Sequence, residues 1–284
     1  MRVAAIQTTA GPDRTENLDA ATPLVEGAAA RGAELVVLPE YFSVAGSAAH
    51  LRAHAEDLAG PTVTWASELA ARLDVALVAG SFPERSTDPA GKVSNTSCLV
   101  GPSGTVEALY RKIHLFDVEL DGTTVQESAA IAAGDRLCVL PLAKYFAEEE
   151  HVPVLGMSIC YDLRFPELYR ILALEGATVV TVPAAFTAAT GPPHWELLLR
   201  ARAVENQIYV VAAAQVGVLP QGMPACHGHS MVVDPWGDVL AELLDDEPGF
   251  VVADVDLGRL EQVRAQLPVL AHRRPDTYRW PDAG

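Results

Sequence analysis

Short apolar runs alternate along the chain with stretches whose apolar residues recur at helical spacing. Short runs rich in β-branched residues predict strands, and apolar residues three or four positions apart predict amphipathic helices. On this pattern we expect helices over 17–31, 62–73, 166–174, 196–206 and 257–266. We expect strands over 2–8, 34–38, 75–81, 96–100, 106–110, 152–159, 177–182, 208–214, 229–235, 239–243 and 250–255. This alternation predicts an α/β fold, and the strand-rich last third predicts mixed sheets.

Two stretches break the alternation. Residues 112–134 show no clear period, which predicts a long loop. Residues 143–151 contain a run of glutamates, which predicts a solvated insertion between two strands. The chain has no internal repeat and no linker, and its prolines and glycines are scattered at turns. We therefore expect a single domain over residues 1–284.

Charge and hydropathy narrow the class of partner. The formal net charge is −17 and the pI is about 4.8. Such a surface repels nucleic acid and anionic membranes, so we expect neither as a partner, whereas a locally basic pocket could still take an anionic substrate. The longest apolar runs are too short to span a bilayer, and the N-terminus enters a strand-like run with no secretory leader.

The four cysteines are too sparse for a disulfide framework. Cys98, Cys138, Cys160 and Cys226 form no C-x-x-C pair and do not cluster with histidines as zinc ligands would. We therefore expect a reducing, cytoplasmic location and no metal.

Cys160 has a position that suits catalysis. It ends the apolar strand 152–159 and opens a turn just before a helix. A residue at such a strand end is held rigidly and can face a cavity. The competing interpretation is a small buried hydrophobe, which is typical of free cysteines and which we keep for the other three.

Two charged residues could support a thiol. Glu40 ends the buried strand 34–38, and a carboxylate desolvated by apolar neighbours readily accepts a proton. Lys112 follows the strand 106–110, and a buried ammonium needs a carboxylate or an oxyanion nearby. The alternatives are a surface glutamate at a turn and a solvated lysine beside Arg111.

Other catalytic patterns are missing from the sequence. No serine lies in a G-x-S-x-G elbow, and no histidines form H-E-x-x-H. We therefore expect His114 and His194 to have structural roles. A papain-like Cys–His enzyme would also leave Glu40 and Lys112 unexplained.

Three segments carry a specific resemblance. LVVLPEYF (35–42), YRKIHLFD (110–117) and SICYDLRFPEL (158–168) resemble the three blocks of the nitrilase superfamily of carbon–nitrogen hydrolases, in that family's order. The segments TGPPHWELLLRARAVENQIYVVAAAQ and GHSMVVDPWG resemble the Nit branch, closest to the deaminated glutathione amidases, with the omega-amidases as the sister group.

The resemblance implies a four-layer α-β-β-α sandwich and a Glu–Lys–Cys triad. It implies that Cys160 is the nucleophile, Glu40 the general base and Lys112 the oxyanion-stabilising residue, with Glu127 as a second glutamate that positions the substrate and the lysine. Tyr161 would add a backbone N–H to the oxyanion site. The implied mechanism passes through a thioester and needs no cofactor.

The resemblance also implies a homodimer or a higher homo-oligomer. The Pro- and Arg-rich segment of about 265–284 resembles an arm that crosses a partner subunit.

The substrate is constrained less than the chemistry. Arg164, four residues after Cys160, could grip a substrate carboxylate in a bidentate manner, or could form a structural ion pair with Asp162 or Glu167. The leading hypothesis is an amidase that releases ammonia from a small carboxylic acid such as deaminated glutathione. The alternatives are an omega-amidase acting on alpha-ketoglutaramate, an N-carbamoyl or nitrile hydrolase, and a non-catalytic binding protein of the same fold.

Overall fold

The computed structural model describes residues 1–120, 123–143, 145, 151–220 and 223–278. Its helices are α1 (Arg14–Ala30), α2 (Ala48–Ala53), α3 (Pro61–Leu73), α4 (Pro166–Leu174), α5 (Gly191–Asn206) and α6 (Leu257–Gln266). Its strands are β1 (Arg2–Gln7), β2 (Leu35–Val37), β3 (Ala76–Arg85), β4 (Val93–Val100), β5 (Val106–Arg111), β6 (Asp117–Leu120), β7 (Thr123–Gln126), β8 (Val139–Pro141), β9 (Val154–Met157), β10 (Val179–Ala184), β11 (Tyr209–Ala214), β12 (Val216–Gly217), β13 (Cys226–His227), β14 (Met231–Val233), β15 (Val239–Glu242) and β16 (Gly249–Asp254).

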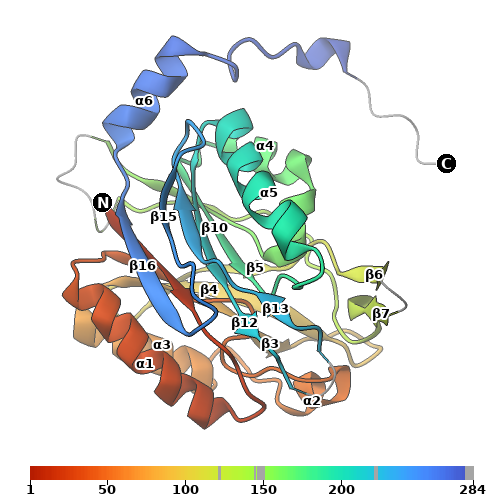
Figure 1. The fold of residues 1–284 in the computed structure, drawn as a ribbon. Coiled ribbons are helices and arrows are strands. Elements are labelled where there is room, and N and C mark those ends of the chain that lie inside the picture. Colours follow the sequence, from red (N-terminus) through yellow and green to blue (C-terminus); the bar gives the residue numbers. More distant parts are fainter. Residues whose placement is uncertain (121–122, 144, 146–150, 221–222, 279–284) are drawn as a thin grey trace.

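Two six-stranded sheets face each other (Figure 1). Their strand orders are β16-β1-β2-β3-β4-β5 and β15-β14-β11-β10-β9-β8, and each combines parallel and antiparallel pairs. Helices α1 and α3 cover the outer face of the first sheet, and α4 and α5 cover that of the second. Strands β1 and β11 meet where the sheets pack together. The predicted four-layer α-β-β-α sandwich is confirmed.

The alternation of side chains along β1 explains how the layers form. Val3 and Ala5 belong to the core between the sheets, whereas Ala4 and Ile6 pack beneath the helices of the first sheet. Because successive side chains of a strand point to opposite faces, a strand buried on both sides reads as a continuous apolar run. This is the pattern from which the strands were predicted.

Several predicted boundaries need correction. The long loop expected over 112–134 contains the antiparallel strand pair β6–β7 and a 3₁₀ turn, Glu127–Ala129. Helix α1 begins before 17, since Asp13 caps it by accepting a hydrogen bond from the Glu16 N–H. Helix α5 begins before 196, since proline is tolerated in a first helical turn.

The short elements α2, β8, β12 and β13 were not predicted. Most of the predicted insertion over 143–151 lies outside the described residues.

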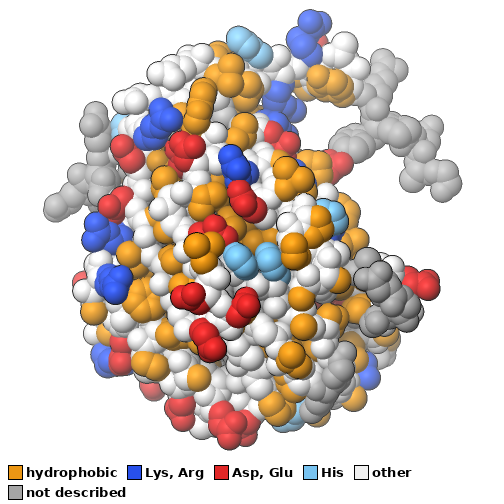
Figure 2. Space-filling view, in the orientation of Figure 1, with side chains coloured by type: hydrophobic (Ala, Val, Ile, Leu, Met, Phe, Trp, Pro, Cys, Tyr) orange, Lys and Arg blue, Asp and Glu red, His pale blue; other side chains and the backbone are white. Residues whose placement is uncertain are grey.

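The surface matches the acidic composition. On the face shown in Figure 2, acidic side chains are spread among apolar ones, and basic side chains lie singly or in small groups. Within the described part of the chain, no helix is both long and apolar enough to cross a membrane. The segment after α6 extends away from the two-sheet body (Figure 1), and its short 3₁₀ turn spans Pro275–Thr277.

Candidate active site

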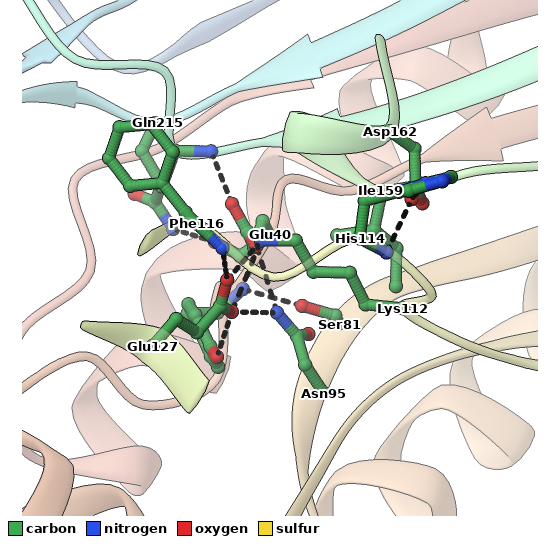
Figure 3. Close-up of polar contacts among 12 residues, drawn as sticks. Glu40, Ser81, Asn95, Lys112, His114, Phe116, Glu127, Ile159, Asp162 and Gln215 are labelled. Atoms are coloured by element: carbon green, nitrogen blue, oxygen red, sulfur yellow. Dashed lines mark hydrogen bonds and ion pairs between the residues drawn. The ribbon is translucent and has the colours of Figure 1, made fainter. Parts of the chain in front are cut away.

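Four charged or nucleophilic side chains come from segments that follow strands. Glu40 follows β2, Lys112 follows β5, Glu127 follows β7, and Cys160 follows β9. Figure 3 shows Glu40, Lys112 and Glu127 pointing toward one another. The strand ends therefore assemble one polar cluster from distant parts of the chain. The backbone of Ala185, which is 145 positions after Glu40, also contacts the Glu40 side chain.

The turn that carries Glu40 is tightly packed. Tyr41 has a φ of 55°, and its N–H donates to the Ser81 hydroxyl at 3.0 Å. A Cβ on Gly80 would lie 1.9 Å from the Pro39 carbonyl oxygen, so the close approach of these segments requires glycine. The Ala185 N–H donates to Glu40 Oε2 at 2.9 Å. The carboxylate is thereby held in one orientation.

Lys112 bridges two buried carboxylates. Its Nζ lies 2.9 Å from Glu40 Oε1 and 2.8 Å from Glu127 Oε2, and its side chain is 2% exposed. Burial alone would lower the pKa of the ammonium, but Glu127 and Glu40 raise it, and it lies well above its ordinary value. Lys112 is therefore a fixed positive charge, as a buried ammonium between two carboxylates must be.

Glu127 is held by several donors. The Phe116 N–H donates to it at 2.7 Å, the Tyr41 hydroxyl at 3.2 Å and the Asn95 side-chain amide at 3.3 Å. Burial and the negative Glu127 raise the pKa of Tyr41 well above its ordinary value, so the hydroxyl remains a donor. Asn95 also donates to Glu40 Oε1 at 2.8 Å.

The sequence interpretation did not include Asn95 or Tyr41. A polar residue inside the buried strand β4 was the available signal for Asn95.

Cys160 lies in the strained turn that opens the 3₁₀ segment Cys160–Arg164. Its φ is 47°, a left-handed conformation that is unfavourable for a residue with a Cβ. Burial raises the pKa of its thiol well above the ordinary value; Glu40 adds to the rise, and Lys112 opposes it. The resting thiol is therefore protonated and needs a base before it can attack a carbonyl.

Two adjoining cavities open onto these residues. The larger, of about 280 Å³, is lined by Glu40, Lys112 and Glu127 among others. The smaller, of about 20 Å³, is lined by Cys160 and Arg164 among others. Phe116 and Ala185 line both, so a ligand that spans the two cavities would pass the thiol and the charged cluster.

Arg164 lies on the thiol side of this space. Its guanidinium carbon is 5.1 Å from the Phe186 ring centroid and 5.9 Å from that of Tyr161, and Nη1 is 3.4 Å from His194 Nδ1. Among the described residues, none of the ion pairs involves Arg164, so the pairing with Asp162 or Glu167 considered from the sequence is wrong. The Asp162 carboxylate is instead occupied by other donors, Ile159, Tyr110 and His114.

The cluster chemistry is that of proton transfer and charge stabilisation. Across the described chain, no group of three or more histidine, cysteine or acidic side chains is arranged to hold a metal ion. The side chain of Tyr161 packs edge-on against Phe116 and Phe165.

The chain is similar to known proteins along nearly its whole length. The carbon–nitrogen hydrolase family matches residues 2–265. The chain is 45% identical over 271 residues to a deaminated glutathione amidase of Synechocystis sp., which covers 95% of this chain and 97% of that protein. It is 39% identical over 280 residues to the omega-amidase NIT2 of Homo sapiens, and the match covers 98% of this chain and 96% of that protein.

The chain is also similar to a solved structure of an amidase. An amidase variant from Nesterenkonia sp. AN1 carries the acetamide moiety of fluoroacetamide on its active-site cysteine. That structure has a TM-score of 0.77 and 29% sequence identity, and covers 98% of this chain and 95% of its own.

Proposed function

The chain belongs to the carbon–nitrogen hydrolase family, and from that premise we propose that it is an amidase in which Cys160 attacks the amide of a small carboxylic acid. The observation that carries the proposal is the buried Lys112 ammonium between Glu40 and Glu127, beside a cysteine in a strained turn. A non-catalytic binding protein would have no use for so costly a cluster.

The charges of the cluster explain how the thiol is activated. Two carboxylates and one ammonium give the buried group a net charge of −1. Direct loss of the thiol proton to solvent would change the net charge of the group from −1 to −2. Transfer of the proton to Glu40 leaves the net charge at −1. Glu40 is the carboxylate close enough to act on the pKa of Cys160. Glu40 is therefore the general base.

The reaction then proceeds through a covalent intermediate. As the sulfur–carbon bond forms, the carbonyl oxygen becomes an oxyanion, which Lys112 and the Tyr161 backbone N–H stabilise. One such donor is typically worth about 3–4 kcal/mol, or 10²–10³ in turnover. The carbon–nitrogen bond breaks as Glu40 returns its proton to the leaving ammonia, and a thioester remains on Cys160. Glu40 then takes a proton from water, whose oxygen attacks the thioester carbonyl. The carbon–sulfur bond breaks, the acid is released, and Glu40 returns the proton to the Cys160 sulfur.

Glu127 has a supporting role in this scheme. It accepts hydrogen bonds from the Lys112 ammonium and from the Tyr41 hydroxyl, and it lines the larger cavity. It thus fixes the ammonium at the place where the oxyanion forms and borders the bound amide.

Arg164 is the reason for proposing that the substrate carries a carboxylate. It lines the cavity that contains Cys160 and has no carboxylate partner among the described residues. Its guanidinium lies over the Phe186 and Tyr161 rings and contacts the ring of His194, which is neutral or cationic, so a substrate carboxylate would be its anionic partner. Deaminated glutathione is the first candidate because of the Synechocystis relative, and alpha-ketoglutaramate is the second because of the human omega-amidase.

The substrate assignment is tested by ammonia release across a panel of amides. We expect turnover of deaminated glutathione to exceed that of alpha-ketoglutaramate and of neutral amides, with Cys160→Ala as the blank. A preference for alpha-ketoglutaramate would make the chain an omega-amidase. Release of carbon dioxide from carbamoyl compounds, with no turnover of any amide, would contradict the amidase proposal.

We also propose that residues 1–284 form one domain that works as a homodimer, with residues 265–284 as an arm across the partner. Apolar side chains on the outer faces of α4 and α5 support this, since Ile171, Leu174 and Val204 are 42%, 44% and 45% exposed. Light scattering should give the mass of a dimer in solution. A mass equal to one chain would contradict the assembly.

We place the enzyme in the cytoplasm, with neither nucleic acid nor membrane as a partner. The four cysteines are all free, as expected in a reducing compartment. The net charge of −17 opposes binding to polyanions. Cell fractionation would test the location. Binding to anionic vesicles or to DNA at physiological salt would contradict the proposal that neither membranes nor nucleic acids are partners.

A further inference from the structure

Asp162, two residues after Cys160, is a buried carboxylate outside the charged cluster. Its side chain is 0% exposed. Its Oδ2 accepts hydrogen bonds from the Tyr110 hydroxyl at 2.6 Å and the Ile159 N–H at 2.8 Å. Its Oδ1 accepts from the His114 N–H at 3.1 Å and from the His114 ring Nδ1 at 2.7 Å. Four donors satisfy a group that can only accept, so the His114 ring carries its proton on Nδ1.

The donors come from the two segments that must be aligned for the reaction. Ile159 immediately precedes Cys160. Tyr110 and His114 lie two residues before and two residues after Lys112. Figure 3 shows Asp162 lying against Ile159 and His114 on the same side of Lys112. One carboxylate therefore joins the turn of the nucleophile to both flanks of the lysine.

This carboxylate also opposes relaxation of the strained turn. Cys160 has a φ of 47°, and such a conformation persists only where the surroundings determine it. The Asp162 N–H donates to the Ile159 carbonyl at 3.0 Å, and the Ile159 N–H donates to the Asp162 side chain. The turn is therefore closed on both sides of Cys160. The His114 ring is further fixed by stacking on Phe165, with centroids 3.6 Å apart.

We propose that Asp162 is a positioning residue, which sets the placement of the Cys160 thiol relative to the Lys112 ammonium through Tyr110, His114 and Ile159. It contacts neither the substrate nor the reacting atoms. The proposal rests on the proposed function in that it takes Cys160 as the nucleophile and Lys112 as the oxyanion donor. Glu40 and Glu127 stabilise the positive charge of Lys112, whereas Asp162 fixes the distance between Lys112 and the Cys160 thiol.

The test replaces the carboxylate with an amide of the same shape. In Asp162→Asn, the amide nitrogen takes the place of one carboxylate oxygen and cannot accept the two hydrogen bonds made there. Either the turn of Cys160 or the segment around Lys112 therefore loses its anchor. A misplacement of about 1 Å can cost about 10²-fold in rate. We therefore expect kcat to fall about 100-fold while KM changes by less than about 3-fold, because substrate contacts remain.

A second readout needs no substrate. The rate at which iodoacetamide alkylates Cys160, followed by peptide mass analysis, should depend on pH differently in Asp162→Asn and in the wild type, since the distances to Lys112 and Glu40 change. Tyr110→Phe removes one of the four donors and keeps the three that Ile159 and His114 supply. It should lower kcat by a smaller factor than Asp162→Asn, and it keeps the proposal testable if the latter variant does not fold.

Glu84→Gln is the matched control. Glu84 is also a buried carboxylate, and it accepts hydrogen bonds from Arg111, which is adjacent to Lys112, and from Thr96. It has no contact with the turn of Cys160. It should lower the melting temperature as Asp162→Asn does, but leave kcat within about 3-fold and the alkylation profile unchanged.

The outcomes separate the positioning role from a merely structural one. Wild-type kcat and an unchanged alkylation profile in Asp162→Asn would overturn the proposal. So would a loss of kcat in Glu84→Gln as large as that in Asp162→Asn. If Cys160→Ala itself kept full activity, the proposed function would fail instead, and that result is independent of the Asp162 variants.

Discussion

Replacing Lys112 by methionine, which has a similar length but no charge, tests the charged cluster most severely. At an effective dielectric constant of about 20, each ion pair at such distances contributes a gross attraction of about 6 kcal/mol. The variant loses both pairs and regains the cost of burying the ammonium, which is several kcal/mol. Breaking a buried pair in this way typically costs a net ~3–5 kcal/mol.

These energies translate into measurable losses. We expect a melting temperature lower by about 6–20 °C in Lys112→Met, since each kcal/mol corresponds to about 2–4 °C in a chain of this size class. Turnover should fall by at least 10²–10³-fold, because an oxyanion donor is also lost. Lys112→Arg keeps a positive charge but presents a planar guanidinium, so it should recover part of the stability and none of the activity.

The sign of the pH dependence follows from the pKa shift. The folded-state pKa of Lys112 is raised above its unfolded value, so its contribution to stability is complete below about pH 10.4, the unfolded value, and is lost as the pH rises through the folded value. Denaturant unfolding between pH 7 and 9 should therefore show a constant difference between wild type and Lys112→Met arising from this lysine. Equal stability of the two proteins, or more than a tenth of wild-type ammonia release in Lys112→Met, would refute the reasoning.

Two further predictions concern the thiol and the substrate. In Glu40→Gln, the negative charge that raises the pKa of Cys160 is gone while Lys112 remains, so alkylation by iodoacetamide should accelerate at lower pH although ammonia release collapses; a shift to higher pH would contradict this. Arg164→Ala should raise KM for a carboxylate-bearing amide and leave KM for its methyl ester unchanged; if the wild type uses acid and ester equally, Arg164 does not bind the substrate.

The sequence predicted the layers well and the irregular segments poorly. Helix α4 and helix α6 lie at the predicted residues, because their ends carry clear signals: a proline opens α4, and the Asp256 side chain caps α6. The sequence pattern predicts a loop where the strands β6 and β7 lie, since each strand is only four residues long. Such short elements gain stability from neighbours that a single-sequence pattern does not reveal.

The candidate site could be predicted in part. Position at strand ends singled out Glu40, Lys112 and Cys160, but only the family resemblance implied that they meet. Spacing along the chain could not reveal it, because Lys112 and Glu40 are brought together across 72 positions. The role of Tyr161 as an oxyanion donor remains a prediction.

Asp162 illustrates what sequence proximity conceals. From the sequence it was considered as an ion-pair partner of Arg164. In the structure its carboxylate is turned inward to Tyr110 and His114, from a segment about 50 residues earlier. A buried carboxylate is stabilised by whichever donors surround it in the fold, and these donors come from a different strand end.

The central claim, a thioester on Cys160, can be measured directly. The enzyme is mixed with a carboxylate-bearing amide, quenched in acid within the first turnovers, and examined by intact-protein and peptide mass spectrometry. We predict one acyl adduct per chain, located on the peptide that contains Cys160, together with loss of both adduct and ammonia release by at least about 10⁴-fold in Cys160→Ala. Ammonia release that persists in Cys160→Ala, or an acyl group on any other residue, would contradict the account.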